Sequence, residues 1–495
     1  MAAHLAALLG VESSITASSS PVGAVRNVSL SPTEHELQGL HRSKSPRVEE
    51  IQEPSQAAQP QPDLEGSPSA PGSPDVEHNT YDFEPATAEL VASLSTPPRN
   101  KWRFASACVM FLANGMNDSA PGALIPYMET DYNIGYAIVS LIFVSNAAGF
   151  LLAAPLTHIL ASRFGRSRTA IFCQVVLVAG FLIVASKTPF PAVVVSYFLL
   201  GLGIAINLAL NNVFIANLAN GTELLGIGHG SYGIGGTIAP LIATAMASHG
   251  VHWSYFFFIT LSLAAFNLPF AGWAFSGFEK DSHGPAALAT TVSASSTAAK
   301  KKSILAKALK AKATLLGALF IFAYQGAEVS ISGWIVSYLI KYRNGDPAHV
   351  GYVSAGFWAG ITLGRFLLSP IARRVGEKLS VFVLVTGVIG FQIMSWLIPN
   401  IIGEAVVVSV LGLLLGPVYP CATVVFNRLL SREIQTTSLG FISAMGSSGG
   451  AVAPLITGLL AQEFGTVVLH PICLGLYGVM LVAWACLPKT AKRSD

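Results

Sequence analysis

Three ionisable side chains stand deep inside long apolar stretches of this sequence: Asp118, Glu328 and Arg365. A charged group at the centre of a bilayer costs at least about 2.5–3.5 kcal/mol, so such residues are usually functional. Burial favours the neutral form of a carboxyl group, whereas water or a cation favours its ionised form. Asp118 and Glu328 could therefore exchange protons as their surroundings change. The alternative is structural: each carboxylate caps backbone groups or pairs with Arg365, which is a partner for Glu328 or part of a gate.

Polar residues repeat at helical spacing beside the two acids, on faces that would point away from lipid. Amide and hydroxyl groups suit a hydroxylated ligand, and Trp334 could stack on such a ligand or simply pack. The competing explanation for the amides is hydrogen bonding between helices. With Trp334, the candidate substrate contacts are Asn114, Asn117, Asn207, Asn211, Tyr324, Gln325 and Ser332.

The composition limits the class of protein that can position these residues. Of 495 residues, 52% are apolar and only 11% are charged, whereas soluble domains carry about 25% charged residues. A soluble protein is therefore excluded, and a disulfide scaffold is too, because all five cysteines lie in apolar runs. The net charge of +3 gives no reason to expect nucleic acid. The sequence has no phosphate-binding loop or metal-ligand motif, so we expect neither an enzyme nor a cofactor.

Twelve apolar runs follow from position 104 onward, each close to the ~20 residues that cross a bilayer. They predict an all-α polytopic membrane protein whose twelve transmembrane helices form two pseudo-symmetric six-helix bundles. The expected spans are 104–128, 136–160, 169–186, 191–218, 229–248, 253–275, 313–340, 349–372, 379–398, 404–428, 437–462 and 468–487. The expected parts are a disordered tail (1–98), an N-terminal bundle (99–275), a linker (276–312), a C-terminal bundle (313–487) and a short tail (488–495).

Lysines and arginines are strongly biased to one side of the expected spans. They cluster in the flanking segments, in the linker and in alternate loops, whereas the opposite loops hold Lys187, Lys341 and Arg343. Because cytoplasmic loops carry the excess of positive charge, both termini should be cytoplasmic. We expect a multi-pass protein of the plasma membrane rather than of the vacuole.

The two halves of the sequence contain matching segments at a nearly constant offset. GGTIAPLIATAMASHG at 235–250 matches GGAVAPLITGLLAQEFG at 449–465. ANGMND at 113–118 matches AYQGAE at 323–328, which places an acid at the same point of each half. Two six-helix repeats of this kind imply alternating access, with the substrate held near the midplane between the halves.

Four segments resemble the major facilitator superfamily, and specifically its fucose/glucose-galactose permease-like branch. They are NGMNDSAPGALIPYME (114–129), GHGSYGIGGTIAPLIAT (228–244), YQGAEVSISGWIVSYL (324–339) and GRFLLSPIARRVGEK (364–378). Fungal members of the bypass-of-stop-codon type look most similar. The resemblance implies a transporter in which Asp118 has a proton role. Bacterial fucose permeases carry a second acid on helix 4, where 206–214 has none here, so Glu328 is the candidate replacement.

The stretch LASRFGRSR at 160–168 resembles the cytoplasmic gating motif of that superfamily, and IARRVGEK at 371–378 is its counterpart in the second half. The acid usual in the motif is Ser162 here, so we expect a weak charge lock in the N-terminal half. The candidate gating residues are Arg163, Gly165, Arg166, Arg365, Arg374 and Gly376.

Three functions are compatible with the sequence. The first is proton-coupled import of a small polar solute such as a sugar or polyol, which the amide-rich faces favour. The second is proton-driven export of a metabolite, and the third is a membrane sensor or lipid-handling protein without turnover. The expected partners are a small-molecule substrate, protons and the lipid bilayer, without nucleic acid, and the protein is expected to be a monomer.

Overall fold

The computed structural model describes residues 92–281 and 298–488, and these residues form helices and connecting turns without a strand. Most of the tail expected at 1–98, part of the linker and nearly all of the C-terminal tail lie outside the described residues. The first half comprises α2 (Asn100–Tyr132), α3 (Tyr136–Val139), α4 (Leu141–Ala185), α5 (Phe190–Ala216), α6 (Gly221–Ser248), η1 (Trp253–Phe256), α7 (Phe257–Ala274) and α8 (Phe278–Asp281).

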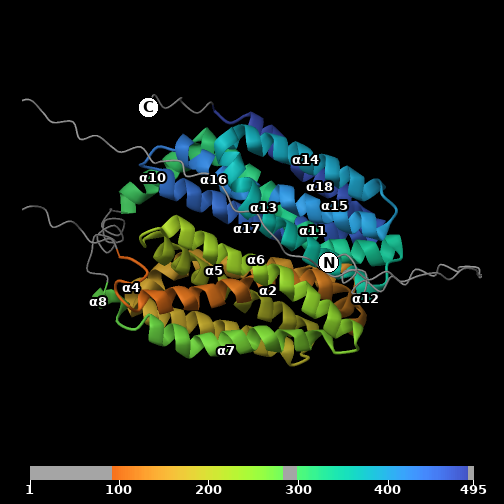
Figure 1. Cartoon of the computed structure of the whole chain (residues 1–495), viewed down its shortest axis with the longest axis horizontal. Coiled ribbons are helices and arrows are strands. Elements are labelled where there is room, and N and C mark those ends of the chain that lie inside the picture. The colour runs from red at the N-terminus through yellow and green to blue at the C-terminus, as the bar shows by residue number, and fades with distance from the viewer. Residues whose placement is uncertain (1–91, 282–297, 489–495) are drawn as a thin grey trace, which may run out of the picture. The chain divides into compact units, whose positions relative to one another are not determined.

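The second half, coloured teal to blue in Figure 1, repeats this pattern after α10 (Ala298–Lys310). It comprises α11 (Lys312–Arg343), α12 (Pro347–Val350), α13 (Tyr352–Val375), α14 (Glu377–Leu397), α15 (Ile401–Leu415), α16 (Val418–Leu429), α17 (Gln435–Phe464), η2 (Thr466–Val468) and α18 (Leu469–Ala485).

Within the described residues, nine helical stretches are long and apolar enough to cross a membrane. One of them, Tyr136–Ala185, contains two spans, because α4 bends at Gly165. Its two arms lie against the same part of α5: Gly149 packs on the Phe198 carbonyl and Gly180 packs on Leu200. α2 and α6 are 33 and 28 residues long but less apolar, because they carry much of the polar and glycine-rich interior. The predicted all-α architecture with twelve spans is confirmed.

Corresponding helices pair in the same way in the two halves. α2 packs on α6 and α7, as α11 packs on α17 and α18, and α4 packs on α5, as α13 packs on α15. Across the halves, α2 contacts α11, α4 contacts α17 and α6 contacts α13. Figure 1 shows α2 and α6 facing α11, α13 and α17 along this interface. The helices that carry Asp118 and Glu328 therefore meet where the halves meet.

The structure adds detail to two predicted stretches. The span predicted over 404–428 is found as Ile401–Leu429, with a turn at Gly416 and Pro417 that separates α15 from α16, because proline has no N–H to continue a helix. The stretch 276–312, expected as a linker, contains the helices α8 and α10.

Large apolar side chains remain exposed on the outer surface of both halves, among them Phe266 at 61%, Leu397 at 71% and Val482 at 65%. A soluble protein rarely leaves extended apolar surface in water, whereas lipid accommodates it. The chain is an integral, multi-pass membrane protein.

Candidate functional site

Asp118 lies on α2 and is held by a tyrosine of α6. The Tyr232 hydroxyl donates to Asp118 Oδ2 at 2.7 Å, and the Asn117 amide donates to Oδ1 at 3.1 Å. The close approach of the helices depends on Gly115, where a Cβ would stand 2.0 Å from the Tyr232 carbonyl oxygen. Sequence reasoning missed Tyr232, although it lies in the segment 228–244 that carried the family resemblance.

Glu328 and Arg365 face each other between α11 and α13. Arg365 Nη2 lies 3.8 Å from Glu328 Oε1, which is an ion-pair distance longer than a hydrogen bond. The Glu328 side chain is 9% exposed and that of Arg365 is 27% exposed, so the arginine is the more accessible partner. Gly416, at the break between α15 and α16, lets α13 approach, because a Cβ there would stand 3.0 Å from the Arg365 backbone nitrogen.

Tyr324 and Gln325 lie on α11 one turn before Glu328, as their spacing predicted. The Tyr324 hydroxyl donates to the carbonyl oxygen of Leu415, the last residue of α15, at 3.4 Å. Gln325 is half-buried against Gly446 of α17, where a Cβ would come 2.6 Å from its Oε1. Both side chains therefore sit next to the acid and contact the neighbouring helices of their own half.

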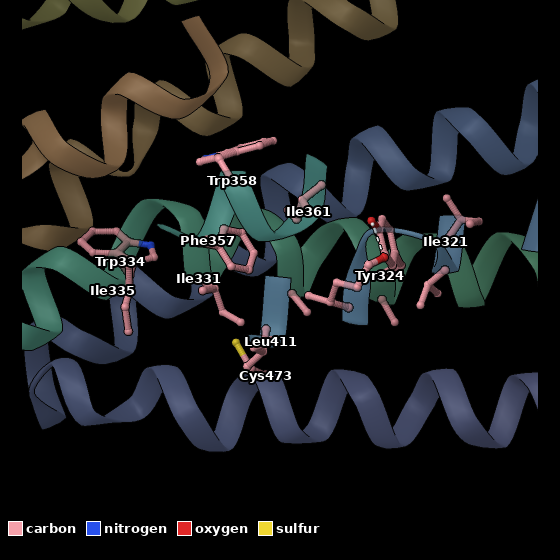
Figure 2. Close-up of a cluster of buried hydrophobic side chains, with 14 of the residues drawn as sticks. Ile321, Tyr324, Ile331, Trp334, Ile335, Phe357, Trp358, Ile361, Leu411 and Cys473 are labelled. Carbon is pink, nitrogen blue, oxygen red and sulfur yellow. Dashed lines mark hydrogen bonds between the residues drawn. The ribbon is translucent and has the colours of Figure 1, made fainter. Parts of the chain in front are cut away.

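An aromatic bridge connects the surroundings of the two acids across the interface between the halves. The Tyr232 ring lies edge-on to the Trp358 ring at a centroid distance of 6.2 Å. The Trp358 indole N–H then donates to Ser332 Oγ at 2.9 Å, and Ser332 is one turn beyond Glu328 on α11. Figure 2 shows Trp358 on the side of α13 opposite Leu411 and Cys473. Sequence reasoning missed Trp358, which gives no signal beyond being an aromatic residue in an apolar run.

Three asparagines of the N-terminal half line a small cavity. Its volume of about 10 Å³ is about that needed for one water. Asn211 Nδ2 donates to Asn207 Oδ1 at 2.5 Å, and Arg166 Nη2 donates to Asn211 Oδ1 at 3.4 Å. For Asn207 and Asn211 this geometry favours the alternative reading, hydrogen bonding within the bundle, over substrate contact. The polar residues that line the cavity are Asn114, Gln174, Asn207 and Asn267.

Trp334 is a packing residue in this structure. Its side chain is 1% exposed, and its indole N–H donates to the Pro454 carbonyl of α17 at 3.0 Å. The rings of Tyr136 and Phe143 lie 5.7 and 6.3 Å away, so Trp334 helps to close the contact of α11 and α17 with α3 and α4. Figure 2 shows it at the far end of the cluster from Tyr324. In this structure Trp334 packs between helices, which is one of the two alternatives that the sequence left open.

The halves touch at the ends of the spans remote from the gating loops. Gly122 of α2 lies against Ser332 of α11, where a Cβ would stand 1.9 Å from the Ser332 carbonyl oxygen. The Tyr127 hydroxyl donates to the Pro347 carbonyl at 3.2 Å. Together with the packing around Trp334, these contacts form a seam at one end of the interface.

A carboxylate contacts the backbone of the candidate N-terminal gating loop, in which residue 162 is serine. Glu279 of α8 accepts a hydrogen bond from the Arg166 backbone N–H at 2.5 Å, and Arg103 pairs with Asp281 at 2.6 Å. The Arg166 guanidinium is buried beside the Phe275 ring, 4.9 Å from its centroid. Glu279 therefore contacts the backbone of this loop. The ion pairs of the described residues include none with the side chains of Arg163, Arg166 or Arg168, so the weak charge lock inferred from Ser162 stays a prediction.

The remaining gating candidates are more peripheral. Arg163 is exposed beside the Phe164 ring, at 6.0 Å, and Arg374 is exposed at the end of α13. Gly376 ends α13 with φ at 107°. The second loop has an ion pair between residues that sequence reasoning did not assign to the gate: Arg428 of α16 binds both carboxylate oxygens of Glu377, at 2.9 and 3.0 Å.

Gly165 should be among the least replaceable residues of the gating loop. Its φ of 76° and ψ of 173° lie in a region that is essentially restricted to glycine. A Cβ there would also stand 2.7 Å from Glu279 Oε1. We expect Gly165→Ala to reduce the free energy of unfolding by about 1–3 kcal/mol, measured as thermal unfolding in detergent micelles.

Substitutions at two other glycines separate the two causes of this loss of stability, which are the backbone conformation and the clash with Glu279. Gly250 has a φ of 78° but open space around its Cβ position, so Gly250→Ala reports the backbone cost alone. Gly226 lies inside α6 with nothing within 4 Å, so Gly226→Ala should stabilise the protein slightly. An unfolding temperature of Gly165→Ala equal to that of Gly226→Ala would contradict the proposed strain.

The fold and the site together define a class: a helical membrane protein built from two related halves, with one buried acid of each half near their interface. A family model of the Major Facilitator Superfamily matches residues 107–409 and 344–495. The chain belongs to the major facilitator superfamily, as the sequence resemblance indicated. This superfamily consists of transporters, so the chain is not expected to be an enzyme.

Relatives and solved structures agree with this assignment. The chain is 28% identical over 425 residues to Bypass of stop codon protein 6 of Saccharomyces cerevisiae, covering 81% of this chain and 85% of the yeast protein. It is 21% identical to the glucose/mannose transporter GlcP of Bacillus subtilis, covering 78% of this chain and 94% of the relative. The crystal structure of the D323A mutant of the nucleoside transporter NupG has the same fold, with a TM-score of 0.63 and 16% identity over 78% of this chain and all of that one.

Proposed function

We propose that this protein moves a small hydroxylated solute across a membrane by alternating access, coupled to protons through Asp118 and Glu328. One observation carries the proposal: the two acids belong to different halves, and Tyr232, Trp358 and Ser332 form a continuous chain of contacts between their surroundings. A change in the charge of either acid can therefore alter contacts that hold the halves together.

The proton step follows from the partners of each carboxylate. Asp118 accepts hydrogen bonds from two neutral donors, Tyr232 and Asn117, which can also stay close to a protonated carboxyl group. Glu328 instead faces a cation, Arg365, at 3.8 Å. Protonation of Glu328 would remove the attraction between α11 and α13, so Arg365 would be free to bind another acceptor, such as a substrate hydroxyl group.

The substrate class is inferred from polar groups near the acids. Asn117 Oδ1 is buried and makes no hydrogen bond within the described residues, and Gln325 is only half-buried beside Glu328. Such amide groups suit ring hydroxyl groups, which both donate and accept. Relatives named as glucose/mannose and nucleoside transporters carry substrates with hydroxylated rings, which supports the same class.

The orientation and location are part of the proposal. The bias of lysine and arginine supports cytoplasmic termini, so the seam formed by Gly122, Tyr127 and Trp334 would face the outside. The protein would act as a monomer in the plasma membrane. The two gating loops, held by Glu279 and by the Glu377–Arg428 pair, would then face the cytoplasm.

The test is simultaneous measurement of solute and proton movement in proteoliposomes that contain the purified protein. A panel of hexoses, polyols, nucleosides and organic acids is offered, and a pH-sensitive dye is trapped inside. Protons that enter with a hydroxylated solute support the proposal. Protons that leave as the solute enters identify the antiporting exporter, and movement of no solute in the panel, in a protein that remains folded, contradicts it in favour of a sensor.

A further inference from the structure

Helix α10 is amphipathic, and the protein covers only part of its apolar side. Ile304 packs against the core and Ala308 is fully buried, where α10 contacts α17. Leu305 and Leu309 are turned about 100° further round the helix and remain 45% and 36% exposed. Two leucines spaced by one turn on one face therefore form a partly exposed apolar strip.

The charged residues of α10 are all positive. Lys307 and Lys310 are exposed, as is Lys312 at the start of α11, and the sequence adds the lysines 300, 301 and 302 in the first turns of the helix. Lys307 lies 2.9 Å from Glu433, with both side chains more than half exposed, so this pair is strongly screened by water. The helix therefore combines a leucine strip with a high density of positive charge.

The position of α10 in the chain puts it directly before a membrane-spanning helix. Ala311 alone separates it from α11, which crosses the membrane. A basic amphipathic helix at this level lies in the interface plane, with its apolar strip at the boundary between headgroups and acyl chains. Lysines near an anionic membrane surface strengthen binding by about fivefold each.

We propose that α10 binds the anionic phospholipid surface of the cytoplasmic leaflet. Leu305 and Leu309 contact the acyl region, and Lys307, Lys310 and Lys312 contact the headgroups. The binding surface belongs to the C-terminal half and is separate from the interface that contains Asp118 and Glu328. Because α10 packs on α17, bound lipid would fix the cytoplasmic end of that helix at the membrane surface.

The test uses the full-length protein in neutral detergent micelles, titrated with phosphatidylserine in one arm and phosphatidylcholine in the other. The apparent affinity is taken from the rise in unfolding temperature. Phosphatidylserine should bind the wild type more tightly, and Lys310→Gln with Lys312→Gln should weaken its binding by about 25-fold. The matched control is Arg168→Gln with Arg373→Gln, which removes two exposed positive charges on α4 and α13 and should retain the preference.

Two further arms test the apolar contact. Leu305→Ser with Leu309→Ser should weaken binding of both lipids, and glycerophosphoserine, which has the headgroup without acyl chains, should not raise the unfolding temperature. Equal affinity for the two lipids, or equal loss in the lysine variant and the arginine control, would overturn the proposal. Each variant is first compared with the wild type without lipid, so that a general loss of stability is not mistaken for lost binding.

Discussion

Asp118→Asn is expected to reduce substrate-driven proton movement to the level of empty liposomes. Asparagine preserves the size of the side chain, and its carbonyl oxygen can still accept the hydrogen bond that the Tyr232 hydroxyl donates to Asp118 Oδ2. The packing of α2 against α6 should therefore survive. It cannot gain or lose a proton, however, so the coupling step is removed. The measurement is the internal pH of proteoliposomes after addition of the transported solute.

The controls separate proton chemistry from general damage. Asp118→Glu keeps a carboxyl group and should restore part of the proton signal. Asp346→Asn removes an exposed carboxylate outside the spans, in the turn before α12, where asparagine can replace it as the helix cap. It should leave proton movement unchanged. Full proton movement in Asp118→Asn would exclude Asp118 as the coupling residue.

Glu328→Gln serves as the counterpart in the second half. It removes the attraction to Arg365 at 3.8 Å while preserving side-chain volume. If Glu328 is the second coupling acid, the variant loses the proton signal as Asp118→Asn does. If Glu328 only neutralises Arg365, the variant should be less stable but still move protons.

Gly122→Val is expected to open the seam between the halves. A Cβ at this position would stand 1.9 Å from the Ser332 carbonyl oxygen, which belongs to the backbone of a helix and cannot rotate aside. Overpacking of this kind typically costs 1–3 kcal/mol, and about 1.4 kcal/mol changes a conformational equilibrium tenfold. Since the cost falls only on conformations in which α2 touches α11, the equilibrium should move towards the open seam by about tenfold or more.

Ser140 provides a position at which to observe the opening. It is fully buried in the seam, next to Gly458, and Ser140→Cys is nearly isosteric. In a background without Cys108 and Cys486, the two native cysteines that are not buried, its labelling by a membrane-impermeant maleimide should be about tenfold faster with Gly122→Val. Gly135→Ala is the matched control at the same seam, because its Cβ would meet only the flexible Gln462 side chain. Equal labelling rates for Ser140→Cys alone, with Gly122→Val and with Gly135→Ala would argue against a moving seam.

Several features could be predicted because they depend on local properties of the chain. The length of an apolar run predicts a transmembrane helix directly, since backbone polar groups in lipid must form their hydrogen bonds within the helix. Asp118, Glu328 and Arg365 were recognisable because a charge in an apolar run is costly wherever its partners lie. The matching segments of the two halves likewise required only the sequence.

The partners of these residues were decided by tertiary packing. Tyr232 reaches Asp118 across 114 positions, and Glu279 reaches Arg166 across 113, so neither contact leaves a periodic signal. Ser162 gives no indication that Glu279 approaches this loop, because the sequence does not show which distant acid packs against it. Trp334 illustrates the same limit: helical spacing places it on a face of α11, but only the approach of α17, α3 and α4 makes that face a packed seam. The sequence alone determined which groups are costly to bury, whereas the distances between helices decided which groups compensate them.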